Sequence, residues 1–279
     1  MPRTLHIRLL GDFRVVADDK LVTSLNTPRL QAFLAYLLLH RDAPQPRHRI
    51  AFLFWPDSSE NQAQSNLRNL LLALRRSLAD VDCYVAIERQ SLQWRDDSTF
   101  DLDIDQFEAL SGDTGRTQDA SAGTSPFHAD PAHALQQAAE LYRGDLLPSC
   151  YDEWILPRRE QLREVFLDVL LRLVGILEDQ HDLTRAILYS QRLVRHDPLR
   201  EEHYRRLMRL HFANGDRAAV LNVYKQCARI LKRELDTEPD SATREIMRQA
   251  RAAERNTVSG KGQASAPILR IGRALATAH

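Results

Sequence analysis

One amphipathic stretch, residues 58–78, constrains the fold of this chain more than any other feature. Its leucines recur at helical spacing and form one narrow apolar face, made of Leu67, Leu70, Leu71, Leu74 and Leu78. At about 100° per residue, the opposite face holds Ser58, Gln62, Ser65, Asn69 and Arg76. Two arginines and an amide flank that polar face, namely Arg68, Arg75 and Asn66. No acidic residue occurs between Glu60 and Asp80, so the sequence predicts a helix with one buried face and one acid-free polar face.

The polar face of this helix has the chemistry that reads the major groove of DNA. Asn and Gln side chains can hydrogen-bond to adenine, Arg can bond to guanine, and Ser and Arg can hold phosphates. The alternative is the solvated face of a helix in an all-α protein, but such faces usually mix charges of both signs. Leu72 lies near the polar face, where it would either touch a thymine methyl group or pack on another part of the protein.

The length and composition are those of a globular protein with about two domains. The chain has 279 residues, of which 43% are hydrophobic and 27% charged. Its formal net charge of zero argues against a nonspecific polycationic coat, but a DNA-binding surface is local and is not excluded. Three cysteines without a CxxC pair are typical of reduced thiols. Because neither a signal peptide nor a membrane-spanning stretch is visible, we expect a cytoplasmic protein without membrane contact.

The elements around the amphipathic stretch follow the order of a winged helix. Residues 5–10 and 13–16 alternate and predict two or three short strands. Helices are predicted from Thr27, where Pro28 suits the first turn, then over residues 47–54, and then over residues 58–78 with Asp57 or Ser58 as the cap. Strands over residues 84–87 and 91–94 form a hairpin. This order predicts a winged helix-turn-helix with the third helix in the groove and the hairpin as the wing.

Four arginines outside the amphipathic stretch are further candidates for phosphate contacts. Arg89 lies at the tip of the predicted hairpin, where the alternative is a merely solvated side chain. The other three lie near predicted helix starts and are Arg29, Arg47 and Arg49. The predicted DNA-binding set is therefore Gln62, Ser65, Asn66, Arg68, Asn69, Arg75, Arg76, Arg29, Arg47, Arg49 and Arg89.

The second half of the chain is predicted to be helical. Residues 101–110 read as a short helix, residues 111–130 as a mobile loop, and residues 255–279 as a flexible tail. Between the loop and the tail we expect helices over residues 131–143, 153–180, 182–195, 200–214, 216–235 and 240–254. Residues 181–186 and 215–220 resemble each other and stand 34 residues apart, the tetratricopeptide period. The fold class is thus mostly α with a small β component: a winged helix followed by an all-α helical repeat domain.

Several short segments resemble the antibiotic regulatory protein family (SARP). Residues 53–60 (LFWPDSSE) and Leu67-Arg68 resemble the DNA-binding half of that family, an OmpR-type winged helix. Further segments resemble its bacterial transcriptional activator domain: residues 142–148 (YRGDLLP), 151–154 (YDEW), 197–201 (DPLRE) and 214–217 (NGDR). The resemblance covers about residues 4–254. It implies a winged-helix domain over residues 1–97, an activator domain over residues 98–254, and a tail over residues 255–279.

The resemblance implies a transcription regulator, usually an activator of pathway or biosynthetic genes. Such proteins bind double-stranded DNA at direct repeats as a head-to-tail pair and recruit RNA polymerase, so the implied partners are DNA, polymerase and a second copy of the chain. Larger family members continue into an ATPase domain. This chain ends at His279 and is either a short two-module regulator or part of a longer parent. Residues 259–262 (SGKG) lack the flanking residues of a phosphate loop.

No catalytic, cofactor-binding or metal site is predicted. The histidines do not cluster, and Asp101, Asp103 and Asp105 lack the Gly and Glu of a calcium loop. Motifs of hydrolases, zinc proteases and dinucleotide-binding enzymes do not occur. We therefore expect no enzyme. The alternative function is a protein-interaction scaffold, in which the helical repeats bind a partner protein and the winged helix does not read DNA.

Overall fold

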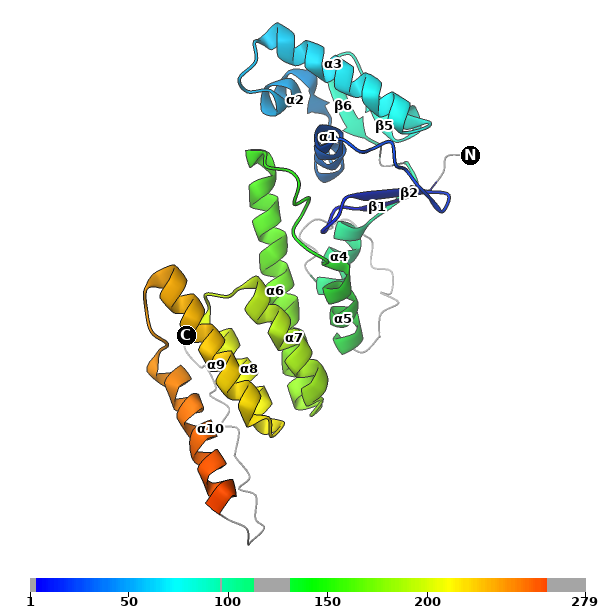
Figure 1. The fold of residues 1–279 in the computed structure, drawn as a ribbon. Coiled ribbons are helices and arrows are strands. Elements are labelled where there is room, and N and C mark those ends of the chain that lie inside the picture. Colours follow the sequence, from blue (N-terminus) through cyan, green and yellow to red (C-terminus); the bar gives the residue numbers. More distant parts are fainter. Residues whose placement is uncertain (1–3, 96, 113–130, 260–279) are drawn as a thin grey trace, which may run out of the picture. The chain divides into compact units, whose positions relative to one another are not determined.

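A computed structural model describes residues 4–95, 97–112 and 131–259, with side chains as far as residue 252. The chain divides into two compact units, residues 1–193 and residues 194–279, with the boundary inside α7 (Leu183–His196). Each unit is described by itself (Figure 1). The described part is mostly helical with a small β component at the N-terminus, which confirms the predicted fold class. The predicted mobile loop 111–130 lies outside the described residues from residue 113 onward.

The first unit opens with a four-stranded sheet in the order β3-β2-β1-β7. The strands are β1 (Leu5–Arg8), β2 (Arg14–Ala17), β3 (Lys20–Leu21) and β7 (Phe100–Leu102). β1 pairs antiparallel with β2 and parallel with β7. Alternation along β1 and β2 buries Leu5, Ile7 and Val15 on one face.

The residues at the end of β7 correct one prediction. The helix predicted over residues 101–110 begins at Asp103, as α4 (Asp103–Ser111), and the two residues before it belong to β7. Leu102 is buried beside β1, and the buried Asp103 carboxylate accepts hydrogen bonds from the backbone of Leu9 and Leu10 at 2.9–3.0 Å. These contacts to a strand far away in the sequence hold the segment extended, which its local helical pattern did not indicate.

Three helices follow the N-terminal strands, as predicted. They are α1 (Pro28–Leu39), α2 (Arg47–Phe54) and α3 (Glu60–Ser77). Thr27 caps α1 through its hydroxyl, which accepts from Leu30 N at 3.3 Å. The cap of α3 is Ser59, and not Asp57 or Ser58 as predicted. Ser58 is taken up by a turn in which its N–H donates to Trp55 O at 3.2 Å, so the helix begins one residue later.

A hairpin completes the winged helix. It consists of β5 (Val85–Ile87) and β6 (Ser91–Trp94), and the short β4 (Gln45–Pro46) joins it in the order β4-β6-β5. A 3-10 turn, η1 (Val81–Cys83), leads into it from α3. The two predicted strands are confirmed within one residue. The first unit therefore contains strands, three helices and a hairpin in the order expected of a winged helix (Figure 1).

The first unit continues beyond the winged helix. α5 (Pro131–Leu141) packs on α4 and on α6 (Leu156–Asp179), where the rings of Tyr142 and Phe166 stack with centroids 4.1 Å apart. The connection to α6 contains a second 3-10 turn, η2 (Glu153–Ile155). There Trp154 lies against Tyr36 and Phe54, at 5.2 and 6.1 Å between ring centroids, so it packs on α1 and α2 and not on α5. The domain boundary at residue 97 stays a prediction, although residues on both sides of it share the β1–β7 pairing.

The second unit consists mainly of α8 (Glu201–Ala213), α9 (Arg217–Leu235) and α10 (Ser241–Ser259). Its core contains buried side chains from α8 and α9, namely Tyr204, Leu207, Met208, Val220, Cys227 and Leu231. α10 extends beyond residue 254, where the flexible tail was predicted to follow. No Gly or Pro interrupts residues 241–259, which explains the longer helix. Residues 260–279 lie outside the described part.

Two turns that stand 34 residues apart have the same hydrogen bonds, as the tetratricopeptide-like repeat predicts. His181 N donates to Glu178 O, and Gly215 N donates to Phe212 O, both at 3.0 Å. The following residues, Asp182 and Asp216, donate back to the preceding helix at 2.9 Å each. His181 and Gly215 both have positive φ, +62° and +78°, which is the left-handed conformation that ends a helix.

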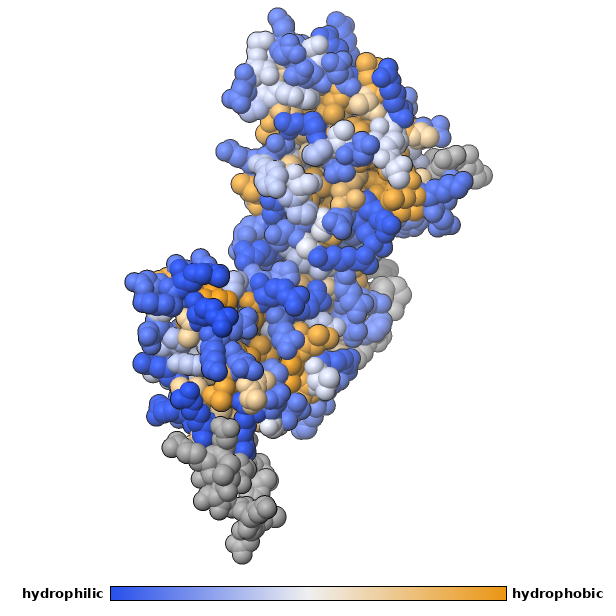
Figure 2. All heavy atoms as spheres, in the orientation of Figure 1, coloured by the Kyte–Doolittle hydropathy of each residue, from blue (hydrophilic) through white to orange (hydrophobic). Residues whose placement is uncertain are grey.

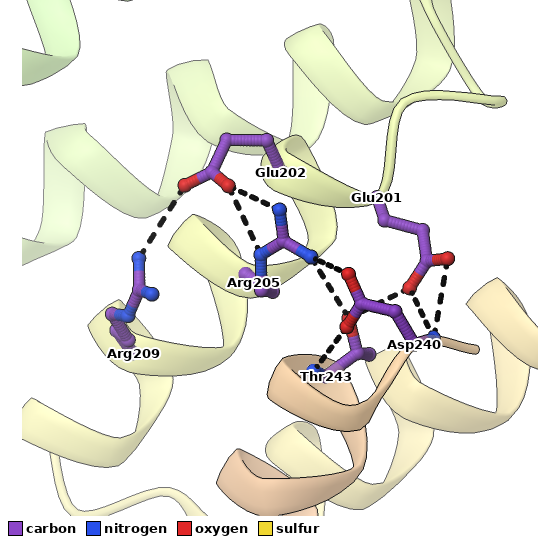
Figure 3. Close-up of polar contacts among 6 residues, drawn as sticks. All are labelled: Glu201, Glu202, Arg205, Arg209, Asp240 and Thr243. Atoms are coloured by element: carbon purple, nitrogen blue, oxygen red, sulfur yellow. Dashed lines mark hydrogen bonds and ion pairs between the residues drawn. The ribbon is translucent and has the colours of Figure 1, made fainter.

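A polar network joins the N-termini of α8 and α10 in the second unit (Figure 3). Arg205 donates to Glu202 on its own helix and to Asp240 before α10. Glu201 accepts from Asp240 N at 3.0 Å and from the Thr243 hydroxyl at 2.7 Å. The guanidinium of Arg205, 15% exposed, thus lies among carboxylates that fix the two helix starts.

Candidate nucleic-acid interface

The candidate interface is the exposed face of α3. Leu67, Leu71 and Leu74 hold the helix in the core through its apolar face. Five members of the predicted set are exposed: Gln62, Arg68, Asn69, Arg75 and Arg76. Ser65 and Asn66 are half-buried. In Figure 2 the surface over α3 is mostly hydrophilic.

The exposed face is rotated from the one that periodicity predicts. Ser24, in the segment before α1, exchanges two hydrogen bonds with Ser77, and this contact lies at the edge of α3 that also carries Asn66. The centre of the exposed face therefore moves toward the other edge, where sequence reasoning missed Asn61 and Gln64, both exposed. Leu72 is 48% exposed, so it does not pack into the described protein, and contact with a thymine methyl group is the alternative that remains.

Partners within the protein distinguish the polar side chains of α3 from one another. Gln62 donates to Asn66 at 2.9 Å, and Arg75 makes an exposed ion pair with Asp82 at 3.3 Å. Within the described residues, no hydrogen bond or ion pair engages the side chains of Arg68, Asn69 and Arg76. These three have their full bonding capacity available to a ligand.

The four arginines outside α3 have different surroundings. Arg29 donates to Asp152 at 2.8 Å, and its guanidinium lies 5.4 and 5.6 Å from the ring centroids of Phe54 and Trp55, so intramolecular contacts already occupy it. Arg47 donates to the backbone oxygen of Glu88 at 3.2 Å and thereby supports the hairpin tip. Two arginines project into solvent: Arg49 on α2 and Arg89 at the hairpin tip.

The geometry brings part of the predicted set together on α3 and adds the hairpin as a separate element. Arg68, Asn69 and Arg76 share one helix face, and Arg89 lies on the hairpin that follows η1. Arg29 belongs to a cluster with Asp152, on the segment that joins α5 to α6. No local sequence signal could have shown this pairing, because the two residues are 123 positions apart.

The described residues show no chemistry of another kind. They contain no group of three or more His, Cys, Asp or Glu side chains arranged to hold a metal ion. Burial raises the pKa of Cys150, and it raises the pKa of Cys227 to about 12, which keeps both thiols protonated and poorly nucleophilic. Among the described helices, none has the length and hydropathy needed to cross a membrane.

Comparison with known proteins gives three findings. The family model described as bacterial transcriptional activator domain matches residues 102–251. The regulatory protein AfsR of Streptomyces coelicolor is 25% identical over 248 residues, which cover 88% of this chain but only 24% of AfsR. The solved structure of Mycobacterium tuberculosis EmbR in complex with a low-affinity phosphopeptide is similar with a TM-score of 0.63 and 18% identity. That match covers 92% of this chain and 70% of the EmbR chain and bears on the fold alone.

Proposed function

We propose a function from one premise: the chain belongs to the SARP-type family of regulators, whose helical module is the bacterial transcriptional activator domain. The chain is a sequence-specific DNA-binding transcription regulator, most consistent with an activator of pathway or biosynthetic genes. It reads the major groove with α3. This proposal extends the family assignment, because the chain spans about a quarter of the length of AfsR.

One observation carries the proposal: Arg68, Asn69 and Arg76 are exposed on a buried-face helix and have no partner within the described residues. A rigid helix holds base-reading groups at fixed spacing, as a recognition helix requires. Asn69 offers the amide geometry that pairs with adenine, and the arginines suit guanine or phosphates. The solvent-exposed pair between Arg75 and Asp82 is weak and exchanges readily for a phosphate contact.

The remaining predicted residues have supporting roles in this proposal. Gln62, Ser65 and Asn66 line the side of α3 where contact with DNA begins. The exposed Arg89 contacts a phosphate or the minor groove from the wing, and Arg49 contacts the backbone beside α2. Arg29 and Arg47 are engaged within the protein and position α1 and the hairpin rather than adding free charge.

The helical repeats supply the other half of the proposed function. Stacked helix pairs present surfaces to protein partners, and here we assign to them contact with RNA polymerase or with a second copy of the chain. Two copies on direct repeats would place one α3 in each half-site. Cytoplasmic location is part of the same proposal, since DNA and polymerase are there.

The test is fluorescence anisotropy of the full chain with two duplexes, one from upstream of its own gene and one scrambled. Titrations at several salt concentrations should show tight binding to the first duplex and a steep loss of affinity with salt, because phosphate contacts release counterions. Weak and equal binding to both duplexes, with no dependence on the residues of α3, would contradict the proposal. That result would favour the scaffold alternative, and capture of a protein partner by the helical repeats would then be measured.

A further inference from the structure

A cleft of about 620 Å³ lies in the first unit, away from the exposed face of α3. The turn after β1 forms one wall, and the segment after α5 forms another. Three arginines from these walls line it, namely Arg8, Arg14 and Arg143. Its apolar lining includes Leu10, Phe13, Leu21 and Pro148. The volume is within the range of about 300–1,000 Å³ that small-molecule sites occupy.

Backbone contacts hold the two walls of the cleft together. Gly11 N donates to Asp145 O at 3.0 Å, and Leu147 N donates to Leu9 O at 2.9 Å. A Cβ on Gly11 would come within 3.3 Å of Arg143, and Gly11 has a φ of +86°, so this position requires glycine. The chain is therefore built for close approach of these two segments.

Buried polar side chains fix the walls further. The guanidinium of Arg159 donates to the backbone oxygens of Leu146, Leu147 and Cys150 at 2.8–2.9 Å. On the other wall, Asp103 holds the end of β1 through the backbone of Leu9 and Leu10. The cleft is thus a preformed feature of the unit rather than a gap between surface segments.

The charges in the cleft are not balanced by the protein. Arg8 and Arg14 lie directly opposite each other in the antiparallel β1–β2 pair, so they share one face of the sheet. Like charges at such positions are destabilising. Within the described residues, no ion pair joins a carboxylate to Arg8, Arg14 or Arg143.

The acidic groups nearby leave a positive excess. Asp12 and Asp145 also line the cleft, and Asp145 already accepts a hydrogen bond from the Tyr142 hydroxyl at 2.8 Å. Burial raises the pKa of Asp103, and the charge of Arg8 opposes that effect from a distance. Three guanidinium groups against two lining carboxylates favour an anion.

We propose that this cleft binds a small organic phosphate. Arg8, Arg14 and Arg143 hold the phosphate, because guanidinium groups bind phosphate oxygens in pairs of parallel hydrogen bonds. The organic part lies against Phe13 and Leu21, the latter 48% exposed without a ligand. The repulsion between Arg8 and Arg14 is relieved when the anion lies between them.

The experiment uses the full chain with phenyl phosphate as the probe. Backbone amide resonances of Gly11 and Gly144 report the cleft in two-dimensional NMR, and thermal unfolding reports stabilisation. Phenyl phosphate should shift both resonances saturably and raise the melting temperature, whereas phenol should do neither. Arg143→Gln should weaken binding about tenfold or more. The matched control Arg233→Gln, an exposed arginine on α9, should bind as the wild type does.

Arg14→Gln gives an independent sign. It should weaken binding and yet raise the melting temperature of the unliganded chain by about 1–3 °C, because it removes the opposed charge. Unshifted glycine resonances, a lower unliganded melting temperature in Arg14→Gln, or equal loss in Arg233→Gln would overturn the proposal. So would benzoate or inorganic phosphate binding as tightly as phenyl phosphate, or displacement of the probe by duplex DNA. Each readout is independent of whether α3 reads DNA.

Discussion

Two helices carry closely spaced arginines, and the chain uses them in opposite ways. On α3, Arg68 and Arg76 are exposed and have no partner within the described residues. On α8, Arg205 lies among carboxylates and is only 15% exposed. The same residue type is therefore available to a ligand in one helix and part of the internal structure in the other.

The acidic residues around each helix account for the difference. α8 begins with Glu201 and Glu202, and Asp240 precedes α10 beside it, so Arg205 has partners on two sides (Figure 3). After Glu60, α3 contains no acid. A guanidinium among carboxylates contributes to folding, and a guanidinium without them is free for phosphates or bases. Counting arginines alone would not separate the two roles.

The largest expected effect follows from removing the unpaired arginines. Arg68→Ala combined with Arg76→Ala should lower DNA affinity about 10- to 100-fold at physiological salt and reduce the salt slope by about two. The melting temperature should stay unchanged, because neither side chain has an intramolecular partner. Anisotropy and thermal unfolding of the same samples measure both. The control Arg229→Ala with Arg233→Ala removes equal charge from α9 and should leave affinity unaltered; a similar loss there would reduce the effect to net charge.

A smaller and more selective effect is expected from Asn69→Ala. It should relax discrimination at one base position by about 1–3 kcal/mol, because one amide pairs with one base edge. Arg89→Ala should instead weaken all duplexes alike, as a wing contact to phosphate would. Binding to a panel of single-base variants of the operator measures the difference. Uniform loss on all duplexes in Asn69→Ala would contradict direct reading by this residue.

On the α8 side of the comparison, Arg205→Ala should destabilise the chain by about 1–2 kcal/mol. The estimate is below that for a fully buried pair because Glu202 and Asp240 are about half exposed. DNA affinity should be unchanged. Denaturant unfolding measures the loss, and Arg209→Ala is the control, since its 59% exposed side chain lies 3.6 Å from Glu202. If Arg205→Ala weakened DNA binding without loss of stability, the division between the two helices would be wrong.

The smallest effect concerns pH and the second unit. Burial lowers the pKa of His203, which Asp197 only partly opposes, and burial also lowers the pKa of His211. Both are neutral in the folded chain and take up protons in the unfolded chain below about pH 6.5. The unfolded state then binds more protons, so stability is full above that pH and falls as the pH decreases through it. Thermal unfolding at pH 8.0 and 5.5 should show the loss, and His203→Leu should reduce it; an unchanged pH dependence in that variant would rule out His203 as a source.

The parts of the fold that the sequence predicts best are governed by local patterns. The leucine spacing of α3 and the alternation of the hairpin strands each specify an element and its buried face without reference to distant residues. The turns at His181 and Gly215 are likewise recognisable from one repeat unit. Family resemblance also rested on such short segments, and the comparison with known proteins confirms it.

The features that sequence reasoning missed depend on distant contacts. The exposed face of α3 is rotated because Ser24 contacts Ser77, 53 residues away. The strand before α4 forms because β1 provides its partner, about a hundred residues earlier. Arg29 seemed a free charge at a helix start until Asp152 was found beside it. None of these contacts leaves a periodic trace in the sequence.

The pairing of β7 with β1 bears on how such a regulator could be divided or recombined. A gene fragment that ended at residue 97 would encode the hairpin but would leave β1 as an unprotected sheet edge, a site where chains aggregate. It would also lack Trp154, and the rings of Tyr36 and Phe54 would lose their cover. Recombination between regulators should therefore succeed only where the crossover lies beyond α6. The unit of inheritance is then longer than the DNA-reading element itself.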